Sequence, residues 1–126
     1  MGNSFGNRVI CEIMAAGKAP PHCKGVVLCG YPLYNKKDDD KNNAARANSL
    51  KNLPADTNTL VIVGTRDEFL TRDYILPETS RGVGLMKNAV AHLTNLKGVM
   101  EIPFGEHTVP KVYTLLFIIN SAKTEN

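Results

Sequence analysis

Three side chains of this sequence could together perform acyl-transfer chemistry: the hydroxyl of Ser4, the carboxylate of Asp67 and the imidazole of His107. Ser4 lies in the stretch GNSFG, residues 2–6, which has the pattern G-x-S-x-G. This pattern is typical of a serine nucleophile on a sharp turn between a strand and a helix. In such a site His107 would take the hydroxyl proton, and Asp67 would fix the imidazole tautomer and stabilise its charged form. The backbone N–H of Phe5 would be one donor to the developing oxyanion.

Each of these residues also has a simpler interpretation. A serine between glycines is common in turns, and Asp67 could be a turn former, with Glu68 and Asp73 as competing carboxylates. His107 could be an exposed loop residue or the flank of a helix. Two further histidines are weaker candidates, because one lies in a proline-rich loop and the other on a predicted helix: His22 and His92.

The apolar pattern predicts the elements that would position these residues. Continuous apolar runs predict buried parallel strands over residues 25–30 and 59–64, and the stretch GVMEIP at 98–103 is interpreted as a third strand. Apolar residues at helical spacing, with local capping signals, predict helices over 6–16, around 44–50, between 83 and 93 and from Thr108 onward. This alternation predicts parallel strands joined by right-handed crossovers, with helices on both faces of the sheet.

The three candidate residues all follow or flank these elements at one edge of the predicted sheet. Asp67 lies three residues after the run 59–64, and His107 lies four residues after the run 98–103. Functional groups of open parallel sheets gather at the carboxyl ends of the strands, so we expect these side chains to meet. The order Ser, Asp, His along the chain is that of α/β-hydrolases and differs from the order in other serine hydrolase folds.

Four stretches carry a resemblance to a known family: GNSFGNR, GVVLCGYPL, LVIVGTRDEF and IPFGEHTV. They resemble successive blocks of the α/β-hydrolase-like domain of the testis-expressed protein and NSL-complex subunit family, which is itself similar to dienelactone-hydrolase-type enzymes. The likeness runs from Gly2 to about Val109, and its more specific marks are GYPL at 30–33 and GTRD at 64–67. It implies a nucleophile, an acid and a base at Ser4, Asp67 and His107.

The same resemblance implies an N-terminal half with several strands. We therefore expect residues 1–126 to form a truncated α/β-hydrolase-like domain that starts at the nucleophile elbow, with about three parallel strands flanked by helices and the N-terminal strands missing. The strand that enters the elbow and the loop with a second oxyanion donor would be absent, and one lost donor costs about 100- to 1000-fold in rate. Asn7, where a small residue is common, would crowd the approach of helix and strand. The strand at 25–30 would become an apolar edge that invites a protein partner.

Composition excludes several classes of function. The 126 residues are 43% hydrophobic and 21% charged with a net charge of +3, which is ordinary for one globular domain. The net charge of the run KKDDDK at 36–41 is close to zero. The sequence has no basic stripe with interleaved aromatic residues, so nucleic-acid binding is not expected. The longest apolar run, 115–119, is far shorter than the roughly 20 residues of a membrane span, and residues 1–8 lack the features of a signal peptide. We expect a cytoplasmic or nuclear protein with no membrane partner.

The cysteine pattern indicates a reducing compartment. Cys11 falls on a predicted buried helix face and Cys29 in a predicted buried strand, so neither is expected to form a disulfide. Cys23 has no Cys-x-x-Cys partner, and His22 beside it makes a poor chelating pair. We expect no metal and no cofactor.

These observations leave three functional hypotheses open. The first is a serine hydrolase that acts on a small ester, thioester or amide, with a small-molecule acyl substrate as its partner. The alternatives are a non-catalytic protein-interaction module or truncated pseudoenzyme, and a fragment without a stable fold. Tyr31, Leu33 and Tyr34 could line an acyl pocket or simply pack in a loop, so the substrate is unknown at this stage.

Overall fold

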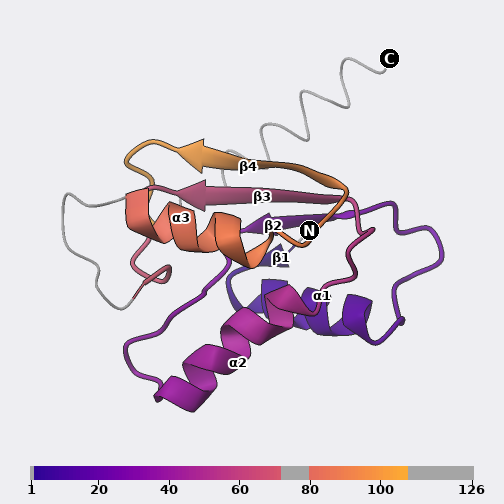
Figure 1. The fold of residues 1–126 in the computed structure, drawn as a ribbon, viewed down its shortest axis with the longest axis horizontal. Helices are drawn as coiled ribbons and strands as arrows, with labels where there is room; N and C mark the ends of the chain where they lie inside the picture. Colours follow the sequence, from indigo (N-terminus) through magenta and orange to yellow (C-terminus); the bar gives the residue numbers. More distant parts are fainter. Residues whose placement is uncertain (1, 72–79, 108–126) are drawn as a thin grey trace.

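Parallel strands and helices alternate along the chain in the computed structural model, which describes residues 2–71 and 80–107 (Figure 1). The elements are β1 (Gly2–Asn3), α1 (Phe5–Ala15), β2 (Val26–Cys29), α2 (Asp40–Lys51), β3 (Thr59–Gly64), α3 (Ser80–Ala89) and β4 (Leu96–Ile102). All neighbouring strands pair in parallel, in the order β1-β2-β3-β4. This confirms the predicted α/β class and its parallel sheet. The helix predicted from Thr108 lies outside the described residues.

The central strands β2 and β3 are continuous apolar segments because consecutive side chains are buried, as Val61, Ile62 and Val63 of β3 are. Val26 lies opposite Thr59, and the pairing continues in register to Cys29 opposite Ile62. Backbone hydrogen bonds at both ends extend the ladder, from Val26 N–H to Asn58 O (2.8 Å) and from Gly30 N–H to Ile62 O (3.0 Å). The predicted boundaries of these strands agree with the structure to within one residue.

The edge at β1 differs from the expectation. A strand entering the elbow was expected to be absent, but Gly2 and Asn3 pair with Leu28 and Cys29 of β2. Two residues are too few to produce a periodic sequence pattern, so this strand could not be predicted. Within the described residues, β1 pairs only with the carboxyl end of β2.

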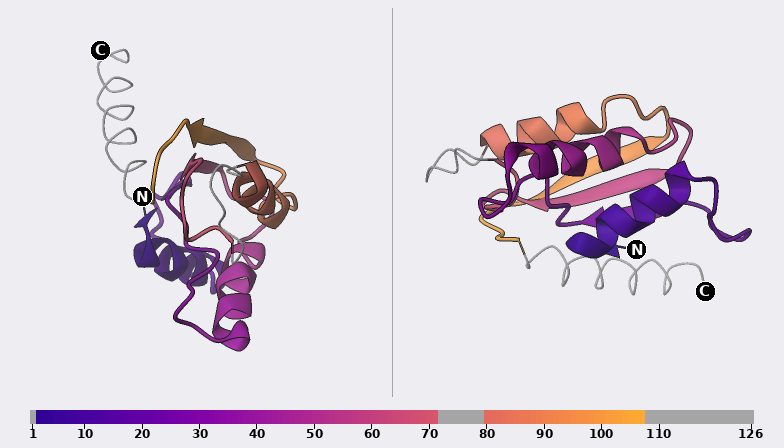
Figure 2. Two further views of the ribbon diagram at one scale, coloured as in Figure 1. Left: turned by 90° about the vertical axis from the view of Figure 1, so that its left-hand side faces the viewer. Right: turned by 90° about the horizontal axis from the view of Figure 1, so that it is seen from below.

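The apolar core lies between the sheet and the helices, and α1, α2 and α3 all pack on one side of the sheet (Figures 1 and 2). The prediction of helices on both faces is therefore wrong for the described residues. The strands follow one another in the order β1-β2-β3-β4, and right-handed crossovers in one direction place every helix on the same face.

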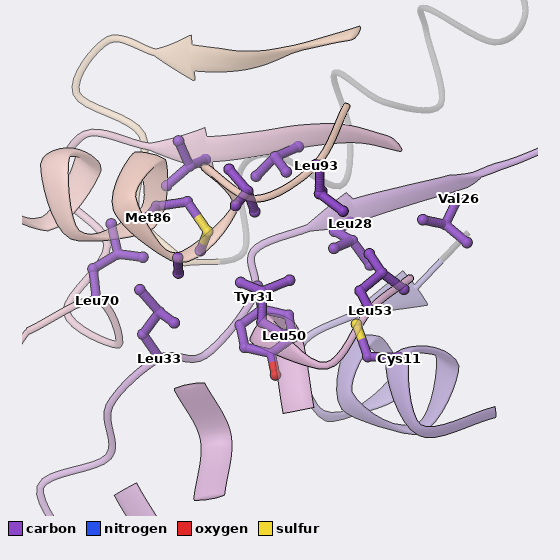
Figure 3. Packing of buried hydrophobic residues seen from close by; sticks show 14 of the residues in the cluster. Cys11, Val26, Leu28, Tyr31, Leu33, Leu50, Leu53, Leu70, Met86 and Leu93 are labelled. Carbon is purple, nitrogen blue, oxygen red and sulfur yellow. The ribbon is translucent and has the colours of Figure 1, made fainter. Parts of the chain in front are cut away.

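Members of the core come from every layer, as Figure 3 shows for Cys11 of α1, Leu28 of β2, Leu50 of α2 and Met86 of α3. All four side chains are fully buried. Full burial of a Leu or Met side chain contributes about 1.5–3 kcal/mol to the free energy of unfolding, so this core stabilises the sheet that carries the site.

The first helix ends as its glycine predicts. Gly17 adopts φ 69°, the left-handed conformation, while Lys18 N–H donates to Ile13 O and Gly17 N–H donates to Met14 O. These two bonds form a Schellman motif, which satisfies the last carbonyl groups of α1. The helix begins at Phe5, one residue before the predicted start.

The second helix is longer than predicted. It begins at Asp40, because the side chain of Asp39 accepts a hydrogen bond from Asn42 N–H (2.8 Å) and caps the helix. The charged run that was interpreted as a loop therefore contains the helix start. No helix within residues 2–71 and 80–107 is long and apolar enough to cross a membrane.

The cysteines differ strongly in exposure, and this predicts their reactivity. Cys11 and Cys29 are buried, as expected from sequence, whereas Cys23 is exposed; all three are free thiols. Burial raises the pKa of Cys11 to about 12, so its thiol stays protonated at lower pH. We expect iodoacetamide at pH 8 to modify only Cys23 in the folded protein, as measured by mass spectrometry of tryptic peptides. Alkylation of Cys11 at the same rate as Cys23 without denaturant would contradict the fold.

Candidate active site

The three side chains singled out in the sequence form one hydrogen-bonded chain. His107 Nε2 lies 2.9 Å from Ser4 Oγ, and His107 Nδ1 lies 2.9 Å and 3.0 Å from the two carboxylate oxygens of Asp67. With Nδ1 protonated it donates to the carboxylate, and Nε2 is then free to accept the serine O–H. The residues come from chain segments up to 103 positions apart.

Ser4 lies on a sharp turn between β1 and α1. Its backbone adopts φ 50° and ψ −124°, a conformation that non-glycine residues rarely occupy. The Ser4 N–H donates to Cys29 O (3.3 Å), so the turn is attached to the neighbouring strand. This geometry presents the hydroxyl beyond the carboxyl edge of the sheet, and strain of this kind persists only where the surrounding structure enforces it.

Phe5, the residue predicted to donate to an oxyanion, lies at the amino end of α1. Phe5 is the first residue of the helix, and the first N–H groups of a helix have no acceptor within it. These groups carry a partial positive charge, which favours a developing negative charge nearby. The side chain of Phe5 is 65% exposed and points away from the core.

Asn7 plays a role that the sequence did not reveal. It was expected to crowd the approach of α1 to β2, but its buried side chain donates from Nδ2 to Cys29 O (2.8 Å). The same carbonyl accepts from Ser4 N–H, so Asn7 helps to fix the elbow against the sheet.

Asp67 is held in place at the carboxyl end of β3. Its N–H donates to Gly64 O (3.2 Å), and its Oδ1 accepts from Phe69 N–H (2.8 Å). The carboxylate side chain is 0% exposed, so it is buried and satisfied by hydrogen bonds from both His107 and the backbone. The competing carboxylate of Glu68 is exposed, and Asp73 lies outside the described residues.

His107 lies on the loop that follows β4, with its side chain 13% exposed. The ring of Phe69 lies 4.4 Å from the imidazole, measured between ring centroids, and limits its rotation. The other histidines are not part of this site. His22 is exposed in the proline-rich loop, and His92 Nε2 lies 2.9 Å from Leu53 O.

Two glycines at strand ends let this loop approach the sheet. A Cβ on Gly30 would lie 2.8 Å from the carbonyl oxygen of His107, and one on Gly64 would overlap the carbonyl of Gly105. Gly30 also has φ 61°, which strains other residues. Gly30 and Gly64 are the first residues of the stretches GYPL and GTRD. A side chain at either position would collide with the loop that carries His107.

Substitution of Gly64 should therefore damage both stability and the site. Gly64→Ala places a methyl group against main-chain atoms that cannot rotate away, so we expect a loss of about 1–3 kcal/mol in the free energy of unfolding. The substitution should also displace His107 relative to Ser4, and in a site that hydrolyses esters a displacement of about 1 Å lowers the rate about 100-fold. Urea unfolding and p-nitrophenyl acetate hydrolysis measure the two effects.

A matched glycine provides the control. Gly84 lies inside α3 with no atom within 4 Å of an added Cβ, so Gly84→Ala should leave activity unchanged and raise stability by about 0.5–1 kcal/mol. Equal effects of the two substitutions would contradict the close approach at Gly64.

Of the three residues considered for an acyl pocket, Tyr31 lies in the core, whereas Leu33 and Tyr34 line a cavity. Tyr31 is buried in the core, and its hydroxyl donates to Arg46 O (2.6 Å). Leu33 and Tyr34 line a cavity of about 430 Å³ between α2, α3 and the loop after β2. Among the described residues no group of three or more His, Cys, Asp and Glu side chains could hold a metal ion.

A parallel α/β sheet that carries a strained serine elbow, a buried acid and a histidine at its carboxyl edge is the architecture of an α/β-hydrolase domain. The family model described as an alpha/beta hydrolase domain matches residues 1–93 of the chain. The chain therefore belongs to the alpha/beta hydrolase domain family. The match includes Ser4 and Asp67, and His107 lies beyond it. No curated protein and no solved structure matches the chain.

Proposed function

We propose that the protein is a serine hydrolase that cleaves a small ester, thioester or amide with Ser4 as nucleophile, His107 as base and Asp67 as the acid. The observation that supports this most strongly is the imidazole of His107, which lies within 3.0 Å of both the serine hydroxyl and the buried carboxylate. Nucleophile, base and orienting group in mutual hydrogen-bond reach are the requirement for covalent catalysis of this kind.

In the acylation step, Ser4 Oγ attacks the carbonyl carbon of the substrate while His107 Nε2 takes the hydroxyl proton. The imidazolium that forms is stabilised by Asp67, which also keeps Nδ1 protonated. Negative charge on the carbonyl oxygen is stabilised by the Phe5 N–H at the start of α1. The tetrahedral intermediate collapses when the leaving group takes the proton from Nε2, which gives an acyl-serine.

Deacylation repeats these roles with water as the nucleophile. His107 takes a proton from the water as it attacks the acyl carbon, and then returns that proton to Ser4 Oγ. The products are the carboxylic acid and the regenerated hydroxyl. A buried carboxylate and a strained serine both cost stability, so a domain that has no use for them has no reason to retain this arrangement. That argument favours catalysis over a silent interaction module.

The finer assignment, to the testis-expressed protein and NSL-complex subunit family, is part of the proposal. Its support is the sequence of the blocks GYPL at 30–33 and GTRD at 64–67, whose glycines allow the approach of the His107 loop. The alternative function is a non-catalytic interaction module or truncated pseudoenzyme, with a protein partner at the β1 edge of the sheet.

Rapid mixing with p-nitrophenyl acetate tests the hydrolase proposal. We expect a burst of about one equivalent of p-nitrophenolate per chain, followed by slower turnover, because an acyl-serine accumulates when deacylation is slow. A folded protein that releases p-nitrophenolate no faster than the buffer would overturn the proposal and favour the silent module.

A further inference from the structure

A second cavity lies beside the histidine of the proposed catalytic site. Its volume is about 510 Å³, and its lining comes from the loop after β2 and the segment after Asp67: Tyr34, Asn35, Lys36, Lys37, Glu68, Phe69 and Thr71. Phe69 connects it to the site, because its ring packs against the imidazole of His107 at 4.4 Å. One side chain, Phe69, thus both lines the cavity and packs on the base of the proposed catalytic site.

The charge of the cavity differs from what the sequence run KKDDDK suggested. Asp38 forms an ion pair with Arg46 (2.7 Å), and Asp39 accepts a hydrogen bond from Asn42 N–H at the start of α2. Both carboxylates thus have partners on α2, and neither forms an ion pair with Lys36 or Lys37. Lys36 and Lys37 are exposed, and within the part of the chain that the structure describes neither side chain has a carboxylate partner.

The loop that carries these lysines is fixed in place. Asn43 of α2 accepts from Asn35 N–H (2.8 Å) and donates to the carbonyl oxygens of Asn35 (3.1 Å) and Asp38 (3.2 Å). Tyr34 N–H donates to Phe69 O (2.8 Å), which joins the loop to the opposite wall of the cavity. A preorganised loop loses little conformational entropy when its lysines bind a ligand.

We propose that this cavity binds an anionic group, a carboxylate or a phosphate, on the acyl substrate of the hydrolase. The inference rests on the proposed function and names the substrate class for the same site. Lys36 and Lys37 supply two positive charges, and Glu68 supplies one negative charge on the same cavity, so the lining carries a net charge of +1. The two lysines attract the anion, and the carboxylate of Glu68 limits the strength of that attraction.

Matched esters test this inference. Mono-p-nitrophenyl esters of adipic, suberic and sebacic acid are compared with their methyl-capped counterparts, which differ only in the terminal charge. We expect kcat/KM of the full chain to favour the charged ester by about 5- to 10-fold for the best chain length, because each exposed charge pair contributes about 2- to 5-fold. The preference should fall in 1 M KCl, where the Debye length is about 3 Å.

Substitutions then assign the effect. The double variant Lys36→Ala with Lys37→Ala should lose the preference, and Glu68→Gln should increase it about 2-fold. Lys41→Ala is the matched control, because Lys41 belongs to the same run but does not line the cavity. Equal rates for charged and capped esters, or a preference that survives in the double variant, would overturn the anion site while the hydrolase proposal stands.

A binding measurement separates the two proposals if neither ester is hydrolysed. Disodium suberate and inorganic phosphate are titrated separately into the protein, and backbone amide chemical shifts of residues 34–37 and 68–71 are followed by NMR. Saturable shifts that the double variant lacks would support the anion site and identify which anion it takes, even though the hydrolase proposal had failed. Chemical-shift changes that do not saturate with either anion would overturn the proposed anion site.

Discussion

Ser4→Ala is expected to lower kcat for ester hydrolysis by about 10⁶-fold, which is about 8 kcal/mol in activation free energy. In the proposed mechanism Ser4 Oγ forms the acyl intermediate, so without it His107, 2.9 Å away, has no nucleophile to activate. The substitution keeps the backbone strain at this position, so the free energy of unfolding should change little. Steady-state kinetics with p-nitrophenyl acetate, together with circular dichroism, measure both quantities.

Ser49, a buried serine away from the candidate site, provides the control. The single hydroxyl hydrogen of Ser49 on α2 is shared between Glu12 Oε1 (2.5 Å) and Ala45 O (3.0 Å), and Ser49 takes no part in the chain of hydrogen bonds at the site. Ser49→Ala should cost about 1 kcal/mol in stability and leave kcat within about 2-fold. A Ser4→Ala variant that retains the activity of the Ser49→Ala variant would show that Ser4 is not the nucleophile.

Asp67→Asn is expected to lower kcat by about 10⁴-fold. The amide has nearly the shape of the carboxylate, but it no longer stabilises the imidazolium and it can hold the ring in the wrong tautomer. The hydrogen bond from Phe69 N–H can be retained by the amide oxygen, so the fold should persist. Kinetics on a neutral ester, with a thermal melt as a measure of folding, test this expectation.

Glu68→Gln is the control for the neighbouring carboxylate. Glu68 is exposed and has no contact with the imidazole, so its substitution should change kcat on a neutral ester by less than about 3-fold. If Glu68→Gln reduced the rate as much as Asp67→Asn, the assignment of the acid to Asp67 would be wrong.

The buried strands were predictable from sequence because burial on both faces requires continuous apolar residues. The runs 25–30 and 59–64 differ from β2 and β3 by at most one residue at each end. The positions of Asp67 and His107 followed from the same logic, since each residue comes a few positions after a parallel strand and such strands end at one edge. The order Ser, Asp, His along the chain then indicated that Ser4, Asp67 and His107 lie together.

Other features have no signal in a single sequence. The strand β1 pairs over two residues, which is too short for any periodicity. The hydrogen bond from Asn7 to Cys29 O depends on how α1 approaches β2, and this angle is set by packing. The positive and negative charges of residues 36–41 are equal in number, but their side chains have different neighbours in the fold. Asp38 forms an ion pair with Arg46, whereas Lys36 and Lys37 line a cavity.

Labelling with a fluorescent fluorophosphonate tests whether Ser4 is an activated nucleophile, because the probe reacts with a serine that a neighbouring base activates. We expect the folded chain to form one covalent adduct, located by peptide mass spectrometry at Ser4. The adduct should be lost in Ser4→Ala and reduced at least about 1000-fold in rate in His107→Ala. A folded protein that does not react, or one whose adduct persists in both variants, would contradict the account.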